Sequence, residues 1–495
     1  MGKKLFVILL AASCLFCSAC SGKPQSAQAP AEQDYNEARS ALAEANRYRT
    51  DVTLSEDEQR LDQKLAEWKA AYIASCDGGN PYEMSFLTDE NIWNSKLYEF
   101  CRLLPKGSDL HLHGLALLPF DELLAFVETR DELFIGTGND NWCVLSVHED
   151  PAEAPADELP VREALERGVI DREELRAQWT VLGGAEAPDI WVWFETLFDK
   201  HLALDGTPAI LEAYYVDAFR YYCRNGILHL EFRELFFGSH ADALADAMAI
   251  RNAYYEVKRE YPDLLVSVIG EGLKYTTLDR AITDTLLDNA LYIRENIKDD
   301  FDPDDVHEFL IGIDLVNEED RSRPLAEFAD QIDEIRKADP DLHLTLHAGE
   351  TLYATSDNVI DAYLLGAERI GHGLNLYRFP EIMDLVCEDG ICLEVCPVSN
   401  QALRYVPDLR SHPGVEYLKR GVPICLSSDD PAYMEHGTLT DDFFAAIVCW
   451  DLGIAEIKQL CQNSITYACI DDAQKAALMQ SWESQWDVFV QQLSK

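Results

Sequence analysis

Short apolar runs alternate with longer amphipathic segments along the chain from residue 105 onward. The runs cover residues 108–113, 227–235, 264–270, 309–316, 342–347, 369–373, 391–396 and 423–428. Between most of them lie segments with helix-compatible apolar spacing, such as 324–338 and 359–367. Eight strands that alternate with helices predict an α/β protein built as a (β/α)8 TIM-like barrel. A doubly wound open sheet is the alternative, although no GxGxxG sequence supports it.

Two further stretches are predicted to extend the barrel, which spans 105–495. Residues 34–75 read as helical within an N-terminal extension over 34–104, because residues 55–58 have capping-box spacing and an apolar stripe follows at Leu61, Leu65, Trp68 and Tyr72. We expect this stripe to pack on the main domain, with a homodimer contact as the alternative. More than a hundred residues separate the first two runs, including a hairpin pattern at 133–147, which predicts an insertion at about 131–190.

The first residues have the pattern of an export signal. Lys3 and Lys4 precede an apolar stretch over 5–16, and small residues then precede Cys20. Residues 1–20 resemble a bacterial lipoprotein signal peptide in which Cys20 is the acylated residue, and 21–33 have the small polar composition of a linker. Cys17 is unusual three positions before the cleavage point, so a plain secretory signal is the alternative. Both predict an exported protein; the lipoprotein signal predicts one that faces the periplasm or cell exterior and meets the membrane only through its lipid anchor.

The charge balance of the chain limits the classes of ligand that it favours. The chain has 41 Lys plus Arg against 89 Asp plus Glu, a formal net charge of −48. Such a surface repels nucleic acid and polyphosphates within a Debye length of roughly 8 Å, and favours a neutral or cationic small molecule.

Eleven of the fourteen cysteines lie beyond the signal segment, without paired CxxC spacing. We therefore assign no disulfide and interpret Cys392 and Cys396 as core residues.

Polar motifs with possible chemistry follow four of the predicted strands. His111 and His113 end the first run, and on a strand residues i and i+2 share a face, so that both imidazoles can reach one metal ion. An HxH pair alone is more often two unrelated histidines. The segment 347–350 (HAGE) places a histidine near a carboxylate, although an ordinary turn with a surface Glu explains it equally well.

The other two motifs are equally ambiguous when taken singly. Residues 369–373 (RIGHG) set His372 between glycines, which permit close backbone approach, or form a plain turn. Asp429 and Asp430 in 427–431 (SSDDP) repel each other and are costly to bury without a cation, whereas a helix N-cap would account for only one of them. All four motifs fall at strand ends, where barrel enzymes carry their chemistry.

Together these segments resemble the adenosine deaminase family. The segments in question are Pro105-Lys106, HLH at 111–113, HAGE, RIGHG, LEVCPVSN at 393–400 and SSDDP, in matching order and approximate spacing over residues 105–470. The chain more closely resembles the secreted, growth-factor-type branch of that family. This branch shares the N-terminal helical extension, a Trp-x-x-Phe-Glu segment (191–195 here), the SSDDPA sequence and the late segment at 449–464.

The resemblance implies a mononuclear zinc enzyme that acts on a purine nucleoside. Its metal ligands would be His111, His113, His347 and Asp429, which hold one Zn²⁺ per chain with a place left for water. Zinc lowers the pKa of that water toward ~7, and the resulting hydroxide would attack C6 of adenosine or 2′-deoxyadenosine to give inosine and ammonia.

The resemblance also assigns the remaining groups. Glu350 would protonate ring N1 and His372 would orient the hydroxide, which with Asp429 makes three catalytic residues. Asp430 would contact N7, and Trp191 and Glu195 would lie near the sugar. Two positions depart from the family pattern: Asn317 stands where a glycine N–H commonly meets purine N3, and Gly114 stands near a position where an aspartate often contacts the ribose.

Three other functions compete with this interpretation. A binuclear amidohydrolase would usually need a bridging lysine at the fourth strand end, and 313–319 contain none. An AMP deaminase should show a basic phosphate pocket, which the acidity of the chain disfavours. A non-catalytic lipoprotein that binds nucleosides should have lost Glu350 or a zinc ligand, and all of these residues are present.

Overall fold

The computed structural model describes residues 32–76, 90–297, 309–435 and 437–495. The chain divides into a short unit that ends at Arg47 and a large unit over Tyr48–Lys495. Within the short unit, the described part is one helix, α1 (Glu32–Ala45). Cys20, the predicted signal peptide and most of the predicted linker lie outside the described residues.

Eight parallel strands form one sheet that closes on itself. These are β1 (Gly107–His113), β5 (Ile227–Glu234), β6 (Leu265–Leu273), β7 (Leu310–Val316), β8 (His343–Ala348), β9 (Arg369–His372), β10 (Cys392–Val395) and β11 (Ile424–Leu426), paired in that order. The last strand returns to the first through a parallel bridge between Leu112 and Asp429, with Asp429 N donating to His111 O at 2.9 Å. The predicted (β/α)8 barrel is confirmed, and its closing contact involves candidate site residues.

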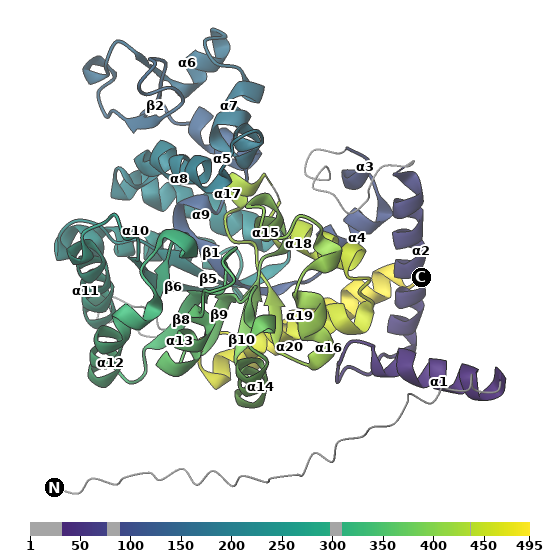
Figure 1. The fold of residues 1–495 in the computed structure, drawn as a ribbon. Helices are drawn as coiled ribbons and strands as arrows, with labels where there is room; N and C mark the ends of the chain where they lie inside the picture. The colour runs from purple at the N-terminus through teal and green to yellow at the C-terminus, as the bar shows by residue number, and fades with distance from the viewer. Residues whose placement is uncertain (1–31, 77–89, 298–308, 436) are drawn as a thin grey trace, which may run out of the picture. The chain divides into compact units, whose positions relative to one another are not determined.

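Helices cover the outside of the barrel, as Figure 1 shows for α10 to α14. The barrel-associated helices are α9 (Pro208–Arg224), α10 (His240–Lys258), α11 (Arg280–Asn296), α12 (Ala329–Ala338), α13 (Asn358–Leu365), α14 (Pro380–Asp389), α15 (Pro397–Ala402), α16 (Gly414–Arg420), α17 (Pro431–Met434), α18 (Leu439–Cys449), α19 (Ile454–Thr466) and α20 (Asp472–Leu493). Residues on the strands are buried on both faces, as expected for a parallel sheet enclosed by helices.

The stretch predicted as helical over 34–75 is two helices rather than one. Helix α2 (Glu56–Ser75) starts at Ser55, whose hydroxyl accepts from Glu58 N while the Glu58 carboxylate accepts from Ser55 N. Residues 46–55 interrupt the helical pattern, because this capping box starts a new helix there. The stripe on α2 packs within the chain: the ring of Tyr72 lies 5.0 Å from that of Phe444. The homodimer stays a prediction.

An additional layer lies between β1 and β5. It contains α5 (Phe120–Glu128), a three-stranded antiparallel sheet of β2 (Leu133–Gly136), β3 (Leu145–Val147) and β4 (Glu158–Pro160), and helices α6 (Val161–Glu166), α7 (Arg172–Trp179) and α8 (Ile190–His201). The predicted hairpin at 133–147 is present as β2 and β3. The Arg404 guanidinium, which follows α15, donates to the carbonyl oxygens of Gly184, Ala185 and Ala187. The insertion is thereby tied to the loops at the carboxyl ends of the strands (Figure 1).

Two short helices, α3 (Glu90–Trp93) and α4 (Lys96–Leu103), precede the barrel. The eleven cysteines within the described ranges are free thiols. No helix in those ranges combines the length and the apolar character that a membrane span requires.

Candidate active site

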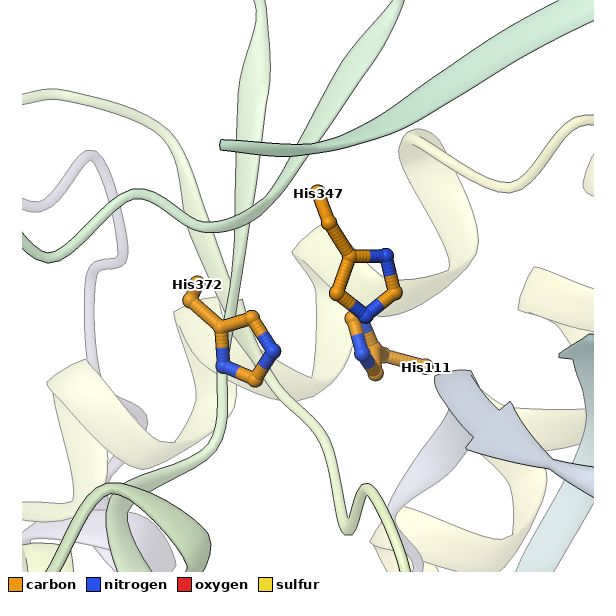
Figure 2. Close-up of side chains that lie close together, drawn as sticks. All are labelled: His111, His347 and His372. Atoms are coloured by element: carbon orange, nitrogen blue, oxygen red, sulfur yellow. The ribbon is translucent and has the colours of Figure 1, made fainter. Parts of the chain in front are cut away.

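Four histidines and one aspartate meet at the carboxyl ends of the strands. His111 and His113 lie at the end of β1, and His347 is the second-to-last residue of β8. His372 ends β9, and Asp429 follows β11. The imidazole centroid of His111 is 4.5 Å from that of His347 and 4.7 Å from that of His372. Figure 2 shows these three rings side by side, although they come from three strands. The structure therefore brings together the side chains that the strand-end motifs predict.

Asp429 faces this cluster with both carboxylate oxygens. Its Oδ1 lies 3.5 Å from His111 Nε2 and 3.4 Å from His113 Nε2, and its Oδ2 lies 4.0 Å from His372 Nε2. His111, His372 and Asp429 are almost completely buried. Imidazole nitrogens and carboxylate oxygens that converge in this way are potential ligands of one divalent cation.

Each of three histidines is oriented by a carboxylate on its other ring nitrogen. His111 Nδ1 is 2.7 Å from Glu394 Oε2, His113 Nδ1 is 2.5 Å from Glu271 Oε1, and His347 Nδ1 is 2.7 Å from Asp314 Oδ2. This is how metal-ligating imidazoles are usually held, because the second hydrogen bond fixes the tautomer and leaves the opposite nitrogen for the metal.

Three observations bear on whether the donor set fits a metal ion. His111 Nε2 is buried and has no hydrogen-bond partner among the described residues, which is costly unless something else contacts it. Burial lowers the pKa of His347 to about 3, so that its imidazole is neutral, as a metal ligand must be. Against burial, which lowers it, Glu271 and Asp430 raise the pKa of His113 to about 10, and a cation would relieve this excess of negative charge.

Buried arginines neutralise the carboxylates behind the histidines. Arg233 contacts Glu394 at 2.5 Å and Asp314 at 3.0 Å, while Arg369 contacts Glu394 at 2.6 Å and Glu231 at 2.5 Å. Against burial, which raises it, the two guanidinium groups hold the pKa of Glu394 far below its usual range. The barrel interior is thus a continuous ionic network that fixes the histidine rings.

Glu350 lies beside the cluster, and its pKa is shifted in the opposite direction to that of Glu394. Its Oε1 is 3.4 Å from His372 Nδ1, and Asn400 Nδ2 donates to the same oxygen at 3.2 Å. Burial, and then the charge of Asp429, raise the pKa of Glu350 well above its usual range. Burial lowers the pKa of His372 well below its usual range. The site therefore holds a carboxyl with a raised pKa next to an imidazole with a lowered pKa.

Asp430 points into the same buried space without acting as a helix cap. It precedes α17, makes no side-chain capping bond, and has one oxygen without a hydrogen-bond partner among the described residues. Burial, and then the charge of Asp429, raise the pKa of Asp430 well above its usual range. A buried carboxyl with an unused oxygen is suited to contact a polar ligand atom.

Three residues of the site have left-handed backbone conformations. His372 has a φ of 60°, Asp429 of 64° and Asn317 of 101°. Such conformations cost about 1–3 kcal/mol each in non-glycine residues and cluster at functional sites. Asn317 thus retains the glycine-type conformation of the family position, and its side-chain oxygen accepts a hydrogen bond from Lys274 N at 2.9 Å.

The predicted sugar-side residues, Trp191 and Glu195 on α8, do not join the histidine cluster. The ring of Trp191 lies 6.3 Å from the ring of Tyr405, and the Glu195 carboxylate accepts a hydrogen bond from the Tyr275 hydroxyl.

The other departure, Gly114, is enforced by packing. A Cβ there would lie 2.1 Å from a Glu234 carboxylate oxygen and 2.5 Å from the Tyr215 hydroxyl. Glu234 and Tyr215 thus fill the space that a side chain at this position would need.

Sequence reasoning missed several residues of the site. Glu394 and Asn400 lie in the 393–400 segment that carried the family resemblance, but no role was assigned to them, and Asp314 on β7 lies outside the segments named for it. Glu271 and Lys274 on and after β6 had no motif to reveal them. The Lys274 amine donates to His347 O at 3.3 Å and so holds the backbone of a candidate ligand.

Comparison with known proteins agrees with this geometry. The sequence profile described as adenosine deaminase matches residues 271–484. Adenosine deaminase 2 of Dictyostelium discoideum is 27% identical over 452 residues, which cover 84% of this chain and 79% of that protein. The chain is similar in sequence to the adenosine deaminase family.

A second relative and a solved structure extend this similarity to sequence and fold respectively. Adenosine deaminase of Lutzomyia longipalpis is 29% identical over 478 residues, with 89% of each protein covered. The crystal structure of an amidohydrolase from Burkholderia ambifaria with bound Zn superposes with a TM-score of 0.56 at 22% identity, covering 80% of this chain and 94% of that one. The chain is thus similar in sequence to hydrolases of the adenosine deaminase family, and it has a TIM-barrel fold with a histidine-rich site at the carboxyl ends of the strands.

Proposed function

We propose that the chain is a zinc-dependent adenosine deaminase that converts adenosine, and 2′-deoxyadenosine, to inosine and ammonia. The observation that carries the proposal is the pairing of a buried cluster of carboxylate-oriented imidazoles with the buried Glu350, whose Oε1 lies 3.4 Å from His372 Nδ1. Hydrolytic deamination needs both parts: a Lewis acid site to activate water, and an acid to make the ring electrophilic.

His111, His113, His347 and Asp429 are the residues that would hold one Zn²⁺. Three imidazoles and a carboxylate suit this borderline ion, and the related amidohydrolase structure with bound Zn supports the choice. When bound, zinc supplies Lewis acidity that brings the ionisation of water close to neutral pH. Asp314, Glu271 and Glu394 would keep the imidazoles in the ligating tautomer.

His372 and Glu350 would handle the protons of the reaction. The neutral His372 imidazole can accept a proton from water that adds to purine C6. The Glu350 carboxyl can donate its proton to ring N1, so that C6 becomes electrophilic. His372 can then pass the proton taken from water to the N6 amino group, so that the C6–N6 bond breaks with release of ammonia, while the hydroxyl proton on C6 returns to Glu350 as the carbonyl of inosine forms. Asn400 Nδ2 lies 3.2 Å from both Glu350 Oε1 and His372 Nδ1, so it would fix the position of these two side chains relative to each other.

Asp430 and the backbone of Asn317 would orient the base, through purine N7 and N3 respectively. Trp191 and Glu195 would lie on the sugar side. Because His113 is followed by Gly114, Leu115 and Ala116, without the aspartate that often contacts the ribose, we expect recognition of the sugar to be weaker than recognition of the base. The net charge of −48 favours a neutral nucleoside over AMP and excludes nucleic acid as a partner. We further propose that the protein is exported and anchored by a lipid on Cys20.

The experiment is to assay ammonia release from adenosine, 2′-deoxyadenosine, adenine and AMP, with metal measured on the same samples. Adenosine should be the preferred substrate. Glu350→Gln should lower kcat by roughly 10²–10⁴-fold, because the general acid is lost. Bound metal should be retained, since Glu350 is not a ligand. Faster turnover of AMP would overturn the substrate, and full activity of Glu350→Gln would overturn the mechanism.

A further inference from the structure

A second group of metal-binding side chains lies at the opposite end of the barrel. His343 is the first residue of β8, Glu368 immediately precedes β9, and Cys469 lies between α19 and α20. A histidine nitrogen, a carboxylate oxygen and the thiol sulfur of these residues all lie within 4.8 Å of one another. None of the three belongs to the candidate active site. We propose that they form a second site for a zinc-type divalent cation.

The chemistry of the donors favours a soft or borderline cation. Imidazole, thiolate and carboxylate are the ligands that Zn²⁺ takes in proteins, and three of them leave one position for water. A tetrahedral ion with bonds of 2.0–2.3 Å needs donor atoms about 3.5 Å apart. The three groups therefore need only small side-chain rotations to close around an ion, and hard cations such as Mg²⁺ would not favour the sulfur.

Access and burial suit an exchangeable ion. The side chain of Glu368 is 47% exposed and that of His343 is 30% exposed, whereas Cys469 is buried. His343 Nδ1 and Glu368 Oε2 are 2.7 Å apart in a hydrogen bond, and the Cys469 sulfur lies within 4.8 Å of a donor atom of each. An incoming cation would replace this hydrogen bond. Binding would release the thiol proton, and any imidazolium proton, to solvent.

The positive charge of Arg369 opposes a cation, because its Nη1 lies 2.8 Å from Cys469 Sγ. Its charge is matched, however, by Glu231 at 2.5 Å and Glu394 at 2.6 Å. Cys469 N also donates to Glu231 at 2.6 Å. The guanidinium would therefore act as a hydrogen-bond donor to the metal-bound thiolate, which is a common way of orienting a ligand.

The test uses the full chain with its catalytic site already filled by zinc, titrated with Co²⁺. We expect one further equivalent to bind and to produce a thiolate-to-cobalt charge-transfer band in the near ultraviolet. Cys469→Ser and His343→Gln should each abolish the band. The outcome is independent of deaminase activity, so that this proposal and the proposed function can fail separately.

Two matched variants should keep the band. Cys396→Ser removes a buried thiol that lies close to His372 and Asp429. His240→Gln removes a histidine that, like His343, pairs with a carboxylate, Asp288 at 2.8 Å, but that is outside the proposed site. A band that survives Cys469→Ser, or one that is lost in Cys396→Ser, would overturn the proposal, as would a folded protein that gives no band. If Cys469→Ser fails to fold, His343→Gln carries the test, because this side chain is partly exposed.

Discussion

The two ends of the barrel carry similar histidine–carboxylate pairs in different surroundings. At the carboxyl ends of the strands, His111 bonds to Glu394 at 2.7 Å, and both side chains are completely buried. At the amino ends, His343 bonds to Glu368 at the same distance, but Glu368 is 47% exposed. Equal geometry therefore does not mean equal energy: the buried pair depends on Arg233 and Arg369, whereas water can replace either partner of the exposed pair.

The largest expected effect tests this difference directly. Glu394→Gln removes the negative charge between Arg233 and Arg369, so it should lower the free energy of unfolding by about 3–5 kcal/mol, because two buried cations lose their common partner. Glu368→Gln should cost at most about 1 kcal/mol. Urea unfolding monitored by circular dichroism measures both. Losses of equal size would contradict the role we give to burial.

A smaller effect, on metal affinity, is expected from Asp314, which contacts the candidate ligand His347 directly. Asp314→Asn keeps the shape of the side chain that holds His347, but removes its charge. We expect metal affinity to fall by roughly 10–100-fold, as is typical for partners that orient a ligating imidazole. Competition with a chelator measures the change. Asp288→Asn, which alters the exposed partner of His240, is the control and should leave affinity unaltered.

The same contrast explains what could be predicted from the sequence. The strands and the motif residues at their ends follow from local patterns, because parallel strands place their carboxyl ends together. His111, His113, His347, His372 and Asp429 are indeed neighbours. Their assignment as zinc ligands, like the other site roles, stays a prediction.

The partners behind the histidines could not be predicted. Glu394 lies 283 residues from His111, and Glu271 lies 158 residues from His113. On a strand such a glutamate looks like any other polar position, and only the closed barrel decides which histidine it meets. Likewise, the group of His343, Glu368 and Cys469 has no sequence spacing that reveals it, because Cys469 comes from a separate turn after the last strand.

The smallest expected effect concerns the exposed pair and its dependence on pH. Against burial, which lowers it, Cys469 and Glu368 raise the pKa of His343 to about 10. Because the folded-state pKa lies above the unfolded value of about 6.5, the pair stabilises the protein fully below about pH 6.5 and loses this contribution as the pH rises toward about 10. The stabilisation is at most about 1 kcal/mol, since Glu368 is partly exposed.

A double-mutant cycle isolates this coupling. Wild type, Glu368→Gln, His343→Gln and the double variant are unfolded in urea at about pH 5.5, 7.5 and 10, with a chelator present so that no cation replaces the hydrogen bond. The coupling energy should be largest at the lowest pH and should vanish at the highest. A coupling that grows with pH would mean that His343 is neutral in the pair. Adding Zn²⁺ should reverse the trend if the cation occupies this site, because metal binding requires a deprotonated imidazole and thiol and therefore strengthens as the pH rises.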